Sequence, residues 1–375
     1  MVRKICGLAA LLLATGVNAV AEDNTVEQIQ KIVYMERNSS SNVVYMEKES
    51  PWFGYFGVGP ETELVRYNTR RGDKDISAKG EGKIVWNIGE VFLGNRNHPN
   101  WTFFGKLQHV TQTDGYGKSN ESTGYLVELW PRYTKRFDNL TLSLAGTYKG
   151  ENMSGNNKTD YDARGSWGYS ALGISPELFY SITPKTTLFL RTLYREDITN
   201  KLDYRKEKFL ESEIGLNYQL TDNVRAGIGY FYKDWDDMPL YDGTKFVERN
   251  YDKKEEIFKA YLSINFPKYD LNITPIIEFG GYSDVMHRAH TGGGLAWDEN
   301  YGFVDKLDET GSYKFILAAH KKITESFSIF GEVSYKFLNT DIDKKVYHAD
   351  RVEILPNGDY DRDVWFCKLL LKYTF

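Results

Sequence analysis

Alternation between apolar and polar residues is the feature of this sequence that most restricts its fold. The stretch LTLSLAGTYK, residues 140–149, places leucine, glycine and tyrosine at every second position and threonine, serine, alanine and lysine between them. Similar alternation recurs at residues 210–220, 224–233, 256–266, 313–320 and 327–337. Successive side chains of a β-strand point to opposite faces, so each stretch predicts a strand with one apolar and one polar face.

The number of these segments and the lengths of their connections indicate how the strands are arranged. About 14 segments of about ten residues follow one another through residues 51–375. They begin near residues 52, 79, 101, 123, 140, 166, 187, 207, 224, 255, 271, 311, 327 and 362. Short links follow every second segment, whereas long polar links, among them 234–254, 283–310 and 340–359, follow the others. Transmembrane barrels have short periplasmic turns and long extracellular loops, so the sequence predicts a single antiparallel β-barrel of this kind.

A soluble β-sandwich is the alternative that also alternates apolar and polar residues. Aromatic residues make up 15% of the chain, and many fall near the ends of the expected strands, where a membrane-interface girdle would place them. Those that we expect there are Trp101, Trp130, Trp167, Tyr125, Tyr133, Tyr180, Tyr218, Tyr313 and Tyr373. We therefore favour a barrel that crosses the bacterial outer membrane many times and contacts its lipid.

The first 21 residues have the pattern of a signal peptide. Arg3 and Lys4 precede an apolar stretch, residues 5–17, and Ala19-Val20-Ala21 provides small residues for cleavage. Cys6 would leave with this segment. Because Cys367 is the other cysteine of the chain, no intramolecular disulfide is expected.

Residues 22–50 are predicted to form a periplasmic arm that precedes the barrel of residues 51–375. The arm contains an internal echo, since residues 32–37, IVYMER, recur as residues 43–48, VVYMEK. The polar spacer at residues 38–42 between the two copies disfavours a continuous helix. The arm is either a flexible tether or a plug or partner-binding segment.

Several short motifs resemble those of the fusobacterial FomA-like major outer-membrane porin family. They are the two echoed VYME segments followed by Glu49-Ser50-Pro51-Trp52, the pair Gly82-Lys83, the segment 101–114 with Gln108-His109-Val110-Thr111, and the terminal Lys372-Tyr373-Thr374-Phe375. The resemblance implies a voltage-responsive, nonspecific diffusion porin that forms a homo-oligomer. It also implies surface loops that bind other cells, and no catalytic residues.

If the apolar face of each strand contacts lipid, the polar face lines the lumen. The pore-lining residues predicted on this basis are Lys83, Lys106, Glu128, Arg132, Arg191, Glu211, Glu213, Arg225, Lys259, Glu278, Lys314, Glu332, Lys336, Lys368 and Lys372. An excess of cations among them favours a lumen that prefers anions. The alternative is that these charges simply hydrate and pair with one another across the wall.

The function that the sequence favours is a porin, a passive diffusion channel for small hydrophilic solutes and ions. An adhesin or receptor that acts through its surface loops is a second hypothesis. A barrel hydrolase is a third, for which only His287 and His290, with Asp284 nearby, lie close together in the sequence. We expect no catalytic residue, cofactor or metal site. The formal net charge of -5, without a concentrated basic stretch, argues against nucleic-acid binding.

The last nine residues, CKLLLKYTF, predict how the chain ends. In one register Cys367, Leu369, Leu371, Tyr373 and Phe375 would face lipid, and in the other Lys368 and Lys372 would face the lumen with Leu370. The terminal Phe375 resembles the signal that is read by the barrel-assembly machinery, which is therefore an expected partner. The same pattern predicts that this strand closes the barrel on the first one.

Overall fold

The computed structural model describes residues 50–71, 74–114, 120–155, 166–200, 207–237, 240–241, 246–290, 302–347 and 352–375. The predicted signal peptide and all of the predicted arm except Ser50 lie outside these ranges, so both stay predictions. No helix among the described residues is long and apolar enough to span a membrane.

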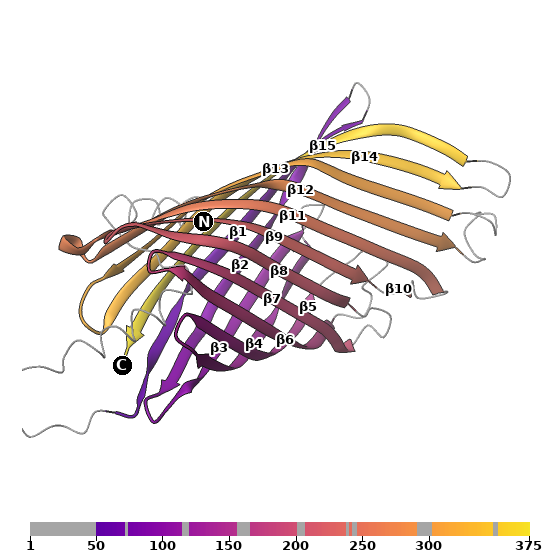
Figure 1. Ribbon diagram of the computed structural model, residues 1–375. Helices are drawn as coiled ribbons and strands as arrows, with labels where there is room; N and C mark the ends of the chain where they lie inside the picture. The colour runs from indigo at the N-terminus through magenta and orange to yellow at the C-terminus, as the bar shows by residue number, and fades with distance from the viewer. Residues whose placement is uncertain are drawn as a thin grey trace, which may run out of the picture.

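Fourteen long antiparallel strands form one closed barrel (Figure 1). Each of these fourteen strands pairs with the long strands before and after it in the chain, and the barrel closes where β15 pairs with β1. A short additional strand, β10, pairs with the beginning of β11. The rest of β11 pairs with β9. The strands are β1 (Trp52–Arg71), β2 (Lys74–Asn95), β3 (His98–Asp114), β4 (Asn120–Arg136), β5 (Leu140–Gly155), β6 (Ser166–Thr183), β7 (Thr186–Asn200), β8 (Glu207–Thr221), β9 (Val224–Asp237), β10 (Leu240–Tyr241), β11 (Phe246–Phe266), β12 (Leu271–His290), β13 (Gly302–Lys322), β14 (Phe327–Tyr347) and β15 (Val352–Thr374). The fold is that of a bacterial outer-membrane β-barrel, and the fold predicted from the alternation is confirmed.

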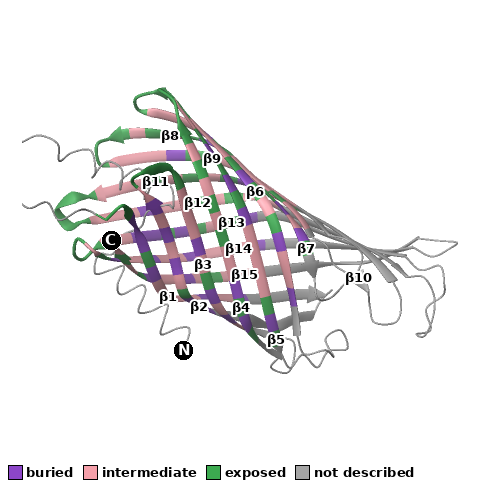
Figure 2. Ribbon diagram, turned by 90° about the horizontal axis from the view of Figure 1, so that it is seen from below, coloured by how far each residue is buried: buried purple, intermediate pink, exposed green. Residues whose placement is uncertain are grey.

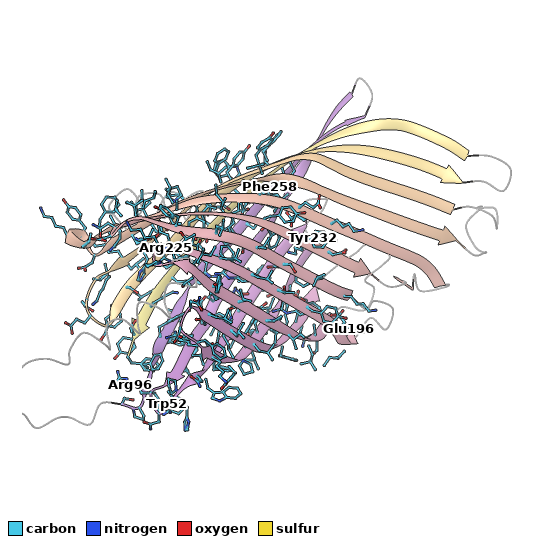
Figure 3. All side chains as sticks on the ribbon, in the orientation of Figure 1. Trp52, Arg96, Glu196, Arg225, Tyr232 and Phe258 are labelled. Atoms are coloured by element: carbon cyan, nitrogen blue, oxygen red, sulfur yellow. The ribbon has the colours of Figure 1, made fainter. Side chains whose placement is uncertain are left out.

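The short predicted links are tight connections at one end of the barrel. Two-residue turns join β2 to β3, β6 to β7 and β8 to β9, and a 3-10 turn, Pro267–Tyr269, joins β11 to β12. Asp270 follows that turn at φ 48°, in the left-handed region that aspartate tolerates better than most residues. Trp52 and Arg96 lie at this end (Figure 3), where the backbone N–H of Arg96 donates to the carbonyl oxygen of Pro51 at 2.8 Å.

The long polar links are shorter than the sequence predicts. Much of 234–254, 283–310 and 340–359 is paired strand, because β9, β11, β12, β13, β14 and β15 extend into these segments. Strands β11 to β15 accordingly project beyond β3 to β9 at the end opposite the tight turns (Figure 1). The prediction failed because alternation is lost where both faces of a strand meet water. The long link expected at 283–310 is therefore wrong for 283–290 and 302–310, which are strand, and residues 291–301 lie outside the described part.

The two faces of the wall differ as the alternation predicts. On β13, Tyr313, Phe315 and Leu317 are exposed on the outer face, whereas Ser312 and Ile316 are buried on the inner face. Figure 2 shows the same alternation of buried and exposed positions along many strands, and in Figure 3 Phe258 projects outward from the wall. Exposed apolar side chains over so large an outer surface are typical of a wall that contacts lipid.

Aromatic side chains gather on the outer face near the tight turns. Trp101 and Tyr133 lie on β3 and β4 with ring centroids 5.1 Å apart, and Tyr180, Tyr218 and Tyr373 are also exposed at this end. One expected member of the girdle is wrong, because Trp130 faces inward and lies under a guanidinium of β7. Its strand alternates so that residues 126, 128, 130 and 132 share the inner face.

Candidate functional site

Contacts between strands that are not neighbours identify the inner face of the barrel. The Nζ atom of Lys336 on β14 lies 2.9 Å from Oε1 of Glu255 on β11, although β12 and β13 separate their backbones. Nη1 of Arg195 on β7 lies 3.9 Å from Oε1 of Glu128 on β4, across β5 and β6. Side chains can cross intervening strands in this way only on the concave side of a closed sheet. The polar face is therefore the inner one, and we name the charged residues on it the inner charge network.

The middle of this network is organised around Glu213 on β8. Its Oε2 lies 3.7 Å from Nη1 of Arg191 on β7, and its Oε1 lies 3.3 Å from Nζ of Lys259 on β11. Lys233 and Glu211 form a neighbouring pair at 3.9 Å. Because one carboxylate serves two cations, this part of the wall carries an excess of positive charge.

Two further ion pairs extend the network around the barrel. Nη2 of Arg132 on β4 donates to Oε1 of Glu177 on β6 at 3.0 Å, and Lys314 on β13 lies 3.8 Å from Glu278 on β12. The cationic side chains of these pairs are 27% and 31% exposed, so water reaches them from inside the barrel. The inner wall of these strands is therefore hydrated and not packed solid.

A second, more tightly packed group lies where β15 closes on β1. Glu90 on β2 is only 2% exposed, and its carboxylate lies 3.5 Å from Nζ of Lys368 and 3.3 Å from Nζ of Lys372. The hydroxyl of Tyr55 donates to the same carboxylate at 2.9 Å. Lys372 also lies over the ring of Tyr55, with Nζ 4.2 Å from the centroid. We name Tyr55, Glu90, Lys368 and Lys372 the seam cluster.

Amides and a carboxylate continue the polar lining beside the seam cluster. Nε2 of Gln108 on β3 donates to Oδ1 of Asn87 at 2.6 Å and to Oε2 of Glu61 at 3.4 Å. Asn87 and Gln108 are both buried. Their amides are therefore satisfied within the wall, as buried polar groups require.

The structure brings most of the predicted pore-lining residues together in these pairs. Those that form ion pairs are Glu128, Arg132, Arg191, Glu211, Glu213, Lys259, Glu278, Lys314, Lys336, Lys368 and Lys372. Nε of Arg225 donates to Oε1 of Gln219 at 3.3 Å. Lys106 and Glu332 occupy inner-face register positions opposite Glu128 and Lys368. Lys83 lies on β2, but its side chain is outside the described part. That these residues line a conducting pore stays a prediction.

Sequence reasoning missed three carboxylates that complete the network, namely Glu90, Glu177 and Glu255. Glu90 was missed because a register shift between Asn87 and Gly89 reverses the alternation along β2. Glu177 is the register partner of Arg191, and strand pairing was the signal that could have identified it. Glu255 stands at the beginning of the segment that the sequence assigns to a strand.

The residues behind the hydrolase hypothesis are not brought together in a described site. His287 and His290 belong to β12, but their side chains lie outside the described part. Among the residues that the structure describes, no three histidine, cysteine, aspartate or glutamate side chains are grouped to hold a metal ion.

No protein-family model matches this sequence, and no curated protein matches it. Solved structures share the fold. A Pseudomonas aeruginosa FadL homologue matches with a TM-score of 0.51 and 10% identity over 86% of this chain and 90% of its own. The deltaS2 mutant of the TodX monoaromatic hydrocarbon channel also matches with a TM-score of 0.51, at 7% identity over 87% of this chain and 91% of its own.

The outer membrane protease OmpT from Escherichia coli is a more distant match. Its TM-score is 0.30 at 9% identity, over 87% of this chain and 98% of its own, which supports no argument about activity. At these identities the comparisons establish the barrel fold alone. They give the resemblance to the fusobacterial porins no support beyond that fold.

Proposed function

We propose that this barrel is a passive channel of the outer membrane through which small hydrophilic solutes and ions diffuse. The observation that carries the proposal is the hydrated inner charge network, which runs from β4 to β14. Lys314 and Arg191 are 31% and 30% exposed within it. Charged side chains in contact with water inside a barrel provide a polar path across the hydrocarbon layer.

The TodX monoaromatic hydrocarbon channel, whose deltaS2 mutant shares this fold, raises the alternative of a path for hydrophobic compounds. The charged inner wall opposes it, because an apolar solute that displaces water from ion pairs leaves them poorly solvated. Four of the rings on the inner face, Phe53, Tyr55, Phe92 and Phe189, are each less than 10% exposed and present little surface to a solute. The resemblance to the fusobacterial porins also supports a hydrophilic path. No described feature favours the adhesin or hydrolase hypotheses.

Single-channel recording with two matched cysteine variants tests the proposal. Lys314 faces inward, and its chain neighbour Tyr313 faces outward and is 54% exposed. In a Cys367→Ser background, Lys314→Cys and Tyr313→Cys are refolded and inserted into a planar bilayer in potassium chloride. A charged, membrane-impermeant methanethiosulfonate reagent is then added. We expect stepwise conductance from both variants and a fall in conductance only for Lys314→Cys.

The refolded state is checked by the heat-dependent shift of the band on a gel. A folded barrel without conductance would overturn the proposal. So would a conductance that the reagent leaves unchanged in Lys314→Cys, since ions would then not pass that side chain.

A further inference from the structure

The inner wall of β7 to β9 holds an aromatic ring flat against the backbone. Phe189 on β7 is 2% exposed, and a Cβ atom on Gly215 of β8 would lie 2.5 Å from its Cζ atom. A Cβ atom on Gly229 of β9 would lie 3.7 Å from the same Cζ atom. The ring therefore lies across β8 toward β9, in the space that two inward-facing glycines leave open. It forms part of the wall and does not project into the lumen.

A guanidinium group lies over this ring on its lumen side. Cζ of Arg191 is 4.9 Å from the centroid of Phe189 and 5.4 Å from the centroid of Phe179 on β6. Phe179 and Phe189 are register partners, so the two rings lie side by side under one cation. The Arg191 side chain is 30% exposed. Since the rings are in the wall, that exposure is toward the lumen.

A second stack of the same kind lies four residues further along β7. Cζ of Arg195 is 5.0 Å from the centroid of the Trp130 ring, and its side chain crosses β6 where Gly173 leaves room for it. Nη2 of Arg195 and Nε1 of Trp130 are buried and have no hydrogen-bond partner among the described residues. A buried donor without an acceptor is costly. Because both atoms are closed off from the lumen, this second stack adds a cation to the wall, and the exposed guanidinium face is that of Arg191.

Stacked guanidinium groups differ from lysines in what they recognise. A guanidinium is flat, so the face away from the ring can stack on a planar solute while its N–H groups donate to a carboxylate. An ammonium group offers charge without that face. From this geometry we propose that the wall formed by β4 to β9 selects planar organic anions, in particular aromatic carboxylates, among the anions that pass. This inference rests on the proposed channel function and names its preferred class of solute.

The neighbouring carboxylates keep such contacts weak enough for passage. Glu213 lies 3.7 Å from Nη1 of Arg191, and Glu128 lies 3.9 Å from Nη1 of Arg195, so each cation is partly neutralised. A channel needs sites that a solute enters readily and also leaves readily. We therefore expect a preference in permeability and not tight binding.

Bi-ionic reversal potentials in planar bilayers test the inference with two anions of similar size and equal charge. Benzoate is planar and cyclohexanecarboxylate is not. For the wild-type protein we expect benzoate to be about threefold more permeant, as a partly exposed cation–π contact would give. Arg191→Lys keeps the charge and removes the flat face, so the ratio should fall toward one.

Arg96→Lys is the matched control. Arg96 lies in the exposed tight turn between β2 and β3, outside the inner charge network and the wall formed by β4 to β9, and its backbone N–H donates to the carbonyl oxygen of Pro51. This variant should keep the wild-type ratio. Conductance in potassium chloride shows that each variant is folded and open. A benzoate to cyclohexanecarboxylate permeability ratio of one in the wild type, or an equal fall of this ratio in both variants, would overturn the inference and leave the channel function standing. A folded wild-type barrel without conductance would overturn both the inference and the channel function.

Discussion

Glu90 on β2 and Lys372 on β15 form an ion pair of 3.3 Å that passes over Gly57 of the strand between them. Gly57 is the register partner of both residues. A Cβ atom at this glycine would lie 3.5 Å from Cγ of Lys372 and 3.7 Å from Cβ of Glu90. The last strand is thus joined to β1 by backbone hydrogen bonds and, on the inner face, to β2 by an ion pair that spans β1.

Removal of the Glu90 carboxylate should weaken the barrel at this junction. Glu90→Ala leaves Lys368 and Lys372 without their shared carboxylate, and breaking such a buried pair costs about 3 kcal/mol. The free energy of unfolding, measured by urea titration of tryptophan fluorescence in lipid vesicles, should fall by that amount. Glu256→Ala, which removes an exposed outer-face carboxylate bonded to Tyr230 at 2.8 Å, should change it little. Equal stability of Glu90→Ala and the wild type would contradict the role of the seam cluster.

Two glycines of β1 should differ sharply in their tolerance of alanine. A Cβ atom on Gly54 would lie 1.9 Å from the carbonyl oxygen of Phe92, so β1 and β2 would have to separate there. We expect Gly54→Ala to lose about 3 kcal/mol of stability, near the upper end for single substitutions. Gly57→Ala, whose Cβ atom meets only ordinary contacts, should fold like the wild type. The fraction of each variant that runs as the heat-modifiable folded band on a gel measures how well it folds. Equal folded fractions for Gly54→Ala and Gly57→Ala would contradict the predicted difference between the two glycines.

Neutralisation of Glu213 should make the channel more permeable to anions. Arg191 and Lys259 lose their common carboxylate in Glu213→Gln, and a unit charge about 8 Å from an ion in water contributes about 0.5 kcal/mol, or about a twofold change in permeability. The reversal potential in a potassium chloride gradient should shift accordingly. Glu256→Gln makes the same charge change on the outer face and should leave it unchanged. A shift toward cations in Glu213→Gln would rule out this assignment of Glu213 to the ion path.

Cys367 should be unreactive while the barrel is folded. It is 1% exposed even though its strand neighbours Trp365 and Leu371 are exposed on the outer face. Residues 1–21, which contain Cys6, are left out so that Cys367 is the cysteine that reacts with maleimide. Its labelling should be at least about tenfold slower in the folded protein than in urea. A tenfold difference corresponds to about 1.4 kcal/mol for the local opening that exposes the thiol. Equal rates would show that β15 opens readily at this position.

The period-two pattern was sufficient to predict the strands and the barrel because membrane and water solvate the two faces of each strand differently. Residues 140–149 show this clearly, since β5 begins at Leu140 and alternates as predicted. The pattern failed where that difference disappears. Beyond the lipid both faces meet water, so 246–254 and 302–310 looked like loops although they are strands.

The inward position of most charged residues also follows from alternation alone, and Lys314, Lys336 and Lys368 illustrate it. The identity of the carboxylates that pair with these cations does not follow from alternation. Glu90 changes face because of the register shift near Gly89, and Glu255 meets Lys336 across two intervening strands. Only the curvature and closure of the sheet bring such side chains together.

The sequence by itself therefore determined which residues form strands and, for most of them, which face they occupy, because these are properties of a single strand and its two solvents. The tertiary structure decided which charges pair, where Arg191 lies on Phe189, and how Glu90 joins β2 to β15. Those contacts depend on the curvature of a closed sheet and on glycines that leave space at particular crossings, and neither is encoded in a local pattern of residues.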